Sequence, residues 1–137
     1  MIHKPTKGYI VDIEKETILN SDYRRVLFTA ENIQLVLMCL EAGDEIGKEV
    51  HHLDQFIRIE EGEGTVVLDG EEFLLVSDQA VIIPKGVEHN VINTGKGKLK
   101  LYSLYAPPEH KDNTIHKTKA DDVEEHFDGV ISSAAKV

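Results

Sequence analysis

Short apolar runs separated by turn residues constrain the fold of this chain more than any other feature. The clearest pair spans residues 65–68 and 72–76, joined through Asp69 and Gly70. Asp-Gly between two apolar runs is a strong hairpin signal, because a tight two-residue turn needs residues that tolerate positive φ. Further short runs end in Gly, Asp, Asn or Pro. The pattern predicts an all-β antiparallel sandwich or barrel.

The run at 33–40 is almost continuously apolar and too short for a confident helix, so we expect a strand covered on both faces. After Pro108 the chain becomes polar, which divides it into a barrel at 1–108 and a tail at 109–137. Thr118 and Asp121 have capping-box spacing and predict a short helix at about 118–127. The expected strands span residues 9–13, 17–19, 24–30, 33–40, 54–60, 65–68, 72–76, 80–83, 89–93 and 99–105.

Charge and hydropathy exclude several classes of partner. The 137 residues suffice for one domain with a core, and the net charge of -10 argues against nucleic acid and anionic membrane surfaces. Residues 1–7 lack the apolar stretch of a secretory signal, and no apolar run approaches membrane-spanning length. We therefore expect a soluble cytoplasmic protein.

Three polar side chains share the parity of a buried apolar face. Glu49, His51 and Gln55 alternate in phase with Ile57 and Ile59. Alternate residues of an extended strand point to the same side, so these polar groups lie at the mouth of an apolar interior. Such groups are costly there unless they are paired, hydrogen-bonded or bound to a metal. The alternation therefore predicts a functional site.

Two stretches resemble the motifs of the cupin superfamily. Glu49 and His51 stand at a His-x-His position, Gln55 at the following Glu position, and Gly62 seven residues later. Residues 84–93, Pro-Lys-Gly-Val-Glu-His-Asn-Val-Ile-Asn, match the end of the second motif in full. The resemblance implies a cupin double-stranded β-helix, a jelly-roll barrel, here followed by a short C-terminal helix or tail.

The resemblance also implies four metal-ligand positions, which are Glu49, His51, Gln55 and His89. Glu49 replaces the first histidine of the family pattern and Gln55 replaces its glutamate. Two imidazoles and one carboxylate suit a divalent Zn, Mn, Fe or Ni ion. Gln55 would be a weak fourth ligand through its amide oxygen, or a hydrogen-bond donor to one of the ligands.

Three functions fit this set, and the first two make the chain a metal-dependent enzyme acting on a small polar substrate. Phosphomannose isomerases also use Gln, Glu and two His, which suggests a sugar or sugar-phosphate isomerase with Glu49 or His52 as general base. Two His and one carboxylate also form the facial triad of non-heme Fe(II) enzymes, here a dioxygenase for a small organic acid or diketone. The third function is non-catalytic binding or sensing of a small ligand. A structural barrel without metal, in which Glu49 and His51 simply pair, is the remaining alternative.

Two expectations concern the ends of the barrel. Small cupins commonly form homodimers, and residues 9–30 are candidates for that contact. His110 and His116 lie in the polar tail, where they are either solvated or part of a lid over the pocket.

Overall fold

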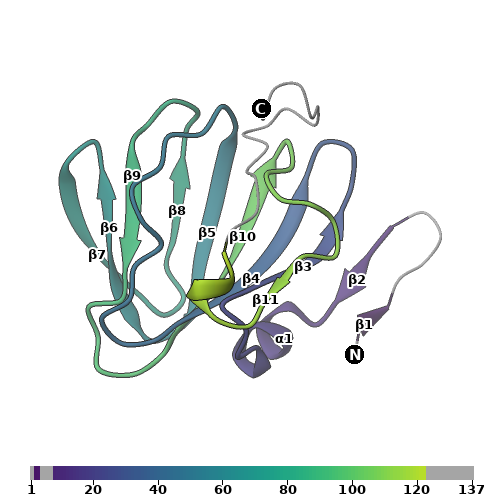
Figure 1. Ribbon diagram of the computed structural model, residues 1–137, viewed down its shortest axis with the longest axis horizontal. Coiled ribbons are helices and arrows are strands. Elements are labelled where there is room, and N and C mark those ends of the chain that lie inside the picture. The colour runs from purple at the N-terminus through teal and green to yellow at the C-terminus, as the bar shows by residue number, and fades with distance from the viewer. Residues whose placement is uncertain (1, 4–7, 123–137) are drawn as a thin grey trace.

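The computed structural model describes residues 2–3 and 8–122, and it confirms an all-β cupin-type fold built from antiparallel sheets (Figure 1). A small hairpin pairs β1 (Ile2–His3) with β2 (Ile10–Val11). The three-stranded sheet has the order β7 (Glu71–Val76), β6 (Glu63–Leu68) and β9 (His89–Ile92). The six-stranded sheet has the order β11 (Ile115–His116), β3 (Arg24–Thr29), β4 (Gln34–Leu40), β10 (Leu99–Ala106), β5 (Asp54–Glu61) and β8 (Ala80–Ile83).

Alternating side chains from the central strands form the core. On β5 the buried face carries Gln55, Ile57 and Ile59, as their shared parity predicts. Each apolar side chain removed from water in this way contributes about 1.5–3 kcal/mol. The strand β4 is buried on both faces, also as predicted. The apolar core residues with 0 % exposure are Val36, Met38, Leu40, Ile57, Ile59, Leu99 and Leu101.

The strand expected at 17–19 is wrong, because this segment belongs to a helix, α1 (Ile13–Leu19). Glu14, Lys15 and Glu16 have straight side chains that lose little freedom in a helix, and carboxylates favour its first turn. The hydroxyl of the buried Thr17 donates to the carbonyl of Ile13 at 2.7 Å, so this polar group is satisfied within the helix. Local helix propensity therefore overrides the short apolar pattern.

The expected strand at 9–13 shrinks to β2, which pairs with β1 in a hairpin that projects from the body of the molecule (Figure 1). Pairing of two copies through residues 9–30 stays a prediction.

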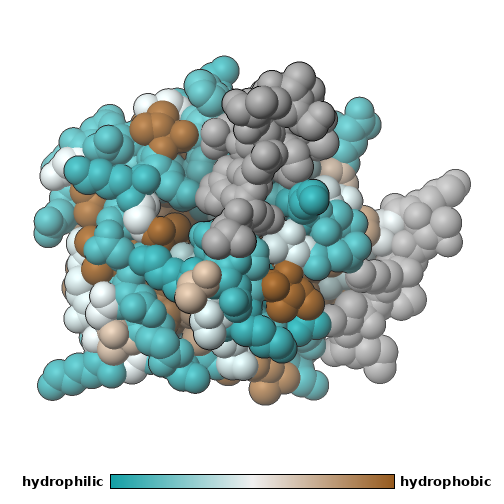
Figure 2. Space-filling view, viewed as in Figure 1, coloured by the Kyte–Doolittle hydropathy of each residue, from teal (hydrophilic) through white to brown (hydrophobic). Residues whose placement is uncertain are grey.

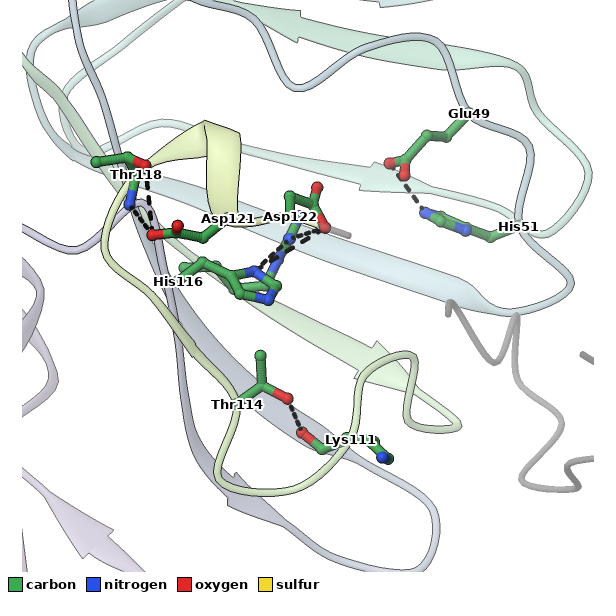
Figure 3. Close-up of polar contacts among 9 residues, drawn as sticks. Glu49, His51, Lys111, Thr114, His116, Thr118, Asp121 and Asp122 are labelled. Carbon is green, nitrogen blue, oxygen red and sulfur yellow. Dashed lines mark hydrogen bonds and ion pairs between the residues drawn. The ribbon is translucent and has the colours of Figure 1, made fainter. Parts of the chain in front are cut away.

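The start of the tail is integrated with the barrel. β11 pairs with β3, and both His110 and His116 are buried, with 3 % and 8 % exposure. The buried Arg24 contacts His116 Nδ1 at 3.2 Å and Asp122 Oδ1 at 3.0 Å, so a guanidinium connects the tail to β3. Figure 3 labels the two tail residues, His116 and Asp122. The division at residue 108 itself stays a prediction.

The helix expected at about 118–127 begins as a 3-10 turn, η1 (Lys119–Asp121). The backbone N–H of Thr118 donates to the Asp121 carboxylate at 3.1 Å, as the capping-box spacing indicates. The remainder of the expected helix lies outside the described residues.

The face of the molecule drawn in Figure 2 is mostly hydrophilic, with separate hydrophobic spots. Among the helices of the described residues, none combines the length and the apolar character needed to cross a membrane.

At Gly62 the chain leaves the six-stranded sheet and enters the three-stranded one. The residue has φ +91°, and a Cβ added there would lie 2.5 Å from the Lys98 carbonyl oxygen. Both the backbone conformation and the close approach favour glycine at this corner.

We expect Gly62→Ala to lower the free energy of unfolding by about 3 kcal/mol or more, since it adds a clash to left-handed backbone strain. Gly70→Ala is the matched control, because Gly70 has φ +84° but open space around it. It should cost only about 1–2 kcal/mol. Urea denaturation measures both variants, and equal losses would contradict the role given to the Lys98 carbonyl.

Candidate metal centre

A reciprocal pair of backbone hydrogen bonds brings the two motifs together. The N–H of Glu49 donates to the carbonyl of His89, and the N–H of His89 donates to the carbonyl of Glu49, each at 2.9 Å. Residues 45–49 thereby run antiparallel beside β9, with a second bridge between Glu45 and Ile92. Directly opposed residues of an antiparallel pair point to the same face. Glu49 and His89 therefore present their side chains together.

Asn90 of the second motif fixes the segment that carries Glu49. Its Oδ1 accepts from the N–H of Gly47 at 2.8 Å, and its Nδ2 donates to Glu45 Oε1 at 2.8 Å. The N–H of Gly86 donates to the carbonyl of His51 at 3.0 Å. The second motif thus positions the first through backbone and amide contacts.

Three of the four predicted ligands converge. Glu49, His51 and His89 each offer one ligand atom, and these atoms lie within 4.8 Å of one another. Figure 3 shows Glu49 pointing at His51, where the Glu49 Oε1 to His51 Nε2 distance is 3.3 Å. The two imidazoles are buried, with ring centroids 5.0 Å apart. The arrangement is a possible metal site of two histidines and one carboxylate.

The orientation of His89 suits a metal ligand. Its Nδ1 lies 2.9 Å from the Val87 carbonyl oxygen, which fixes the proton on Nδ1. Burial lowers the pKa of His89, so the imidazole is neutral at neutral pH. Its Nε2 is buried and has no hydrogen-bond partner in the described part of the chain. The nitrogen lone pair is left available for a cation.

Gln55, the fourth predicted ligand, supplies a second buried acceptor. The side chain is 4 % exposed, and its Nε2 donates to Ser103 Oγ at 3.4 Å. Its Oε1 makes no hydrogen bond to any described residue. A buried acceptor left in this state costs about 1–3 kcal/mol. Together with two imidazoles and a carboxylate, this donor set fits a divalent transition metal.

The structure does not bring His52, the second candidate base, into this cluster. The side chain is exposed, while His51 and Leu53 on either side of it are buried. This is the alternation of an extended segment, in which neighbours face opposite sides.

Two further residues, Tyr105 and Glu109, lie next to His51. The Tyr105 ring meets the His51 ring edge-on at 6.1 Å, and burial raises the pKa of its phenol so that the proton stays. Tyr105 shares the inward parity of Leu101 on β10, so the alternation of this strand places its ring on the buried side. Glu109 is fully buried, and its Oε2 lies 3.7 Å from His51 Nδ1. Neither motif nor periodicity marks Glu109 in the sequence.

A second acidic group, formed by Glu14, Glu60 and Asp78, lies elsewhere. Arg58 approaches Glu60 at 3.4 Å and Asp78 at 3.1 Å. Arg58 already pairs with two of the three carboxylates, so we assign no metal to this group.

Sequence comparison identifies the family. A family model described as "Cupin domain" matches residues 36–105, the span that contains both motifs. The chain belongs to the cupin family. This cupin is 44% identical over 124 residues to the uncharacterized protein YrkC of Bacillus subtilis (strain 168), covering 85% of this chain and 67% of that one. It is 37% identical over 121 residues to the uncharacterized protein L612 of Acanthamoeba polyphaga mimivirus, covering 84% and 75%.

Solved structures agree with this assignment. The crystal structure of BH2720 from Bacillus halodurans shares 43% sequence identity with the cupin. The two superpose with a TM-score of 0.83 over 88% of this chain and 97% of that chain. The likeness therefore extends beyond the motif region to most of the fold.

Replacement of Gln55 by Leu tests whether its amide oxygen is reserved for a metal. We expect Gln55→Leu to raise the free energy of unfolding of the metal-free protein by about 1 kcal/mol, because a buried acceptor without a partner disappears. The same change should weaken Zn²⁺ binding about tenfold. Chemical denaturation and a competition titration measure the two effects.

Ser103→Ala is the matched control, since it removes the partner of Gln55 Nε2 and leaves Oε1 in place. It should lower stability and leave Zn²⁺ affinity unchanged. A Gln55→Leu protein that binds Zn²⁺ as tightly as the wild type would show that the amide is no ligand.

Proposed function

We propose that this cupin holds one divalent transition metal on Glu49, His51 and His89, with Gln55 as a further oxygen ligand, and that it acts on a small polar molecule. The observation that carries the proposal is the convergence of three ligand atoms within 4.8 Å at a buried position. The unpartnered Nε2 of His89 and the unpartnered, buried Oε1 of Gln55 support it. Iron, zinc, manganese and nickel all accept such ligands.

Among the possible reactions, the geometry best supports oxidation by an Fe(II) dioxygenase acting on a small organic acid or diketone. Two histidines and one carboxylate are the facial ligand set of non-heme Fe(II) oxygenases. An isomerase needs a general base, and neither predicted candidate suits that task. Glu49 belongs to the ligand cluster, and His52 is exposed outside it.

The side chains of the site have distinct tasks in this proposal. Fe(II) bound here would supply the redox chemistry of dioxygen. Glu49 contributes the negative charge that a buried dication requires, and His89 offers its Nε2 while Val87 holds its Nδ1 proton. Tyr105 keeps its phenolic proton because it is buried, and its ring limits the movement of His51.

Metal content is the first test. We expect about one transition-metal ion per chain in protein purified without a histidine tag. Glu49→Ala and His89→Ala should each lose most of it, because each removes one of few strong ligands. Inductively coupled plasma mass spectrometry measures the metal.

His52→Ala is the control for these variants, since it also removes a side chain next to the site but outside the ligand cluster. It should retain wild-type metal content. If the wild type contains no transition metal, and no added metal raises its thermal stability, the metal site is wrong.

Oxygen consumption separates the reaction types. We expect protein reloaded with Fe(II) to consume oxygen with at least one member of a panel of small acids, phenols and diketones. Zn²⁺-loaded protein should consume none, because Zn²⁺ has no redox chemistry. An oxygen electrode measures the rate, and product analysis checks that it follows substrate loss.

Two other results would replace the oxygenase proposal. Aldose–ketose interconversion with Zn²⁺ or Mn²⁺, without oxygen uptake by the Fe(II) form, would establish an isomerase. Ligand-dependent stabilisation without turnover would establish a binding or sensing role.

A further inference from the structure

A buried glutamate of the tail lies next to His51, on the side of the ring that faces away from Glu49. Glu109 follows β10, is 0 % exposed, and directs Oε2 to within 3.7 Å of His51 Nδ1. An ionised carboxylate is costly to bury unless charged or hydrogen-bonding groups compensate it. The location of Glu109 therefore needs a structural cause and a chemical partner.

The structural cause is Gln34 on β4, which is also 0 % exposed. Its Oε1 accepts from the N–H of Glu109 at 3.1 Å and from the N–H of His110 at 3.0 Å. Its Nε2 donates to the His110 carbonyl at 2.7 Å and to Thr29 Oγ1 at 2.9 Å. The amide thus uses both lone pairs and both protons. Gln34 fixes the backbone from which the Glu109 side chain extends.

The chemical partner is His51, whose ring lies between two carboxylates. Its Nε2 is 3.3 Å from Glu49 Oε1 on the ligand side, and its Nδ1 is 3.7 Å from Glu109 Oε2 on the far side. Contacts with the Tyr105 ring and the His89 ring restrict rotation of the imidazole. Each nitrogen of His51 therefore faces a carboxylate, and a cation bound at Nε2 would leave the proton on the side of Glu109.

His89 shows the same arrangement with a different acceptor. Its Nδ1 faces the Val87 carbonyl oxygen at 2.9 Å, and its Nε2 faces the site. Metal-bound histidines usually donate their second ring N–H to a carbonyl or carboxylate, which fixes the tautomer and raises the basicity of the ligating nitrogen. Val87 occupies that place for His89.

We propose that Glu109 is the positioning residue for His51: its carboxylate, 3.7 Å from Nδ1, favours the proton on that nitrogen and thereby leaves Nε2 for the metal. Gln34 acts one step further out by holding the Glu109 backbone. The inference rests on the proposed metal site for its effect on affinity. In the metal-free protein Glu49 and Glu109 compete for the His51 proton, so removal of Glu109 should move that proton towards Nε2.

The first experiment needs no metal. Long-range proton–nitrogen NMR spectra of the metal-free protein, recorded at alkaline pH where imidazole is neutral, report how the His51 proton is shared between Nδ1 and Nε2. We expect a larger Nδ1–H share in the wild type than in Glu109→Leu, because the substitution leaves Glu49 as the carboxylate that faces the ring. An equal Nδ1–H share in the two proteins overturns the inference, whether or not the protein binds a metal.

The second experiment compares variants by Zn²⁺ competition titration. Glu109→Leu removes the carboxylate beside Nδ1 and should weaken binding about 10- to 100-fold, with a smaller Nδ1–H share in the metal-free protein. Glu109→Gln keeps the shape and one oxygen, so it should fold like the wild type and give an intermediate Nδ1–H share and an intermediate affinity. Glu60→Gln is the control for the loss of a buried carboxylate away from this site, and it should leave Zn²⁺ affinity unchanged.

The outcomes separate the two proposals. If the wild type binds no metal, the proposed function fails, and the His51 tautomer in the wild type and in Glu109→Leu still decides the role of Glu109. If the wild type binds Zn²⁺ and Glu109→Leu binds it as tightly as Glu60→Gln, the positioning role is wrong while the metal site stands.

Discussion

The reciprocal hydrogen bonds between the backbones of Glu49 and His89 are the constraint on which the site depends. They set the register between residues 45–49 and β9, and so decide which side chains face the interior. Side chains alternate along a strand, so a slip of one residue would replace Glu49 by Lys48 or Val50 at the inner face. Asn90 opposes such a slip through its bonds to Gly47 and Glu45.

The same register places polar groups where the fold would otherwise favour apolar ones. The site lies among side chains of the core, where orphaned acceptors reduce stability. Part of that cost is offset inside the protein, because Val87 satisfies His89 Nδ1 and Ser103 satisfies Gln55 Nε2. The atoms that remain, His89 Nε2 and Gln55 Oε1, have no hydrogen-bond partner among the described residues. These are the atoms that the proposed cation would contact.

The sequence predicted most of the sheet structure, because strands follow from strict alternation and from turn residues. Alternation also marked Glu49 and His51, whereas His89 joined them only through the resemblance to the cupin motifs. Asp69 and Gly70 form the expected hairpin turn, and both have positive φ. The Asn93 side chain donates to the carbonyls of Leu40 and Gly97, which fixes the loop after β9. The helix α1 was missed because a short apolar segment reads equally well as a strand. Glu109 could not be predicted, since its place depends on contacts with Gln34, 75 residues away, and no local spacing records such a contact.

The hydrogen bonds by which Gln34 holds the start of the tail have a consequence for how sites of this kind can vary. Gln34 bonds to peptide groups at positions 109 and 110 and to none of their side-chain atoms. These contacts with the backbone therefore do not depend on which side chains the two residues carry. A substitution at position 109 would change the charge beside His51 and keep the hydrogen bonds of Gln34. The surroundings of one imidazole can thus vary by a single replacement at a position whose backbone is held from another strand.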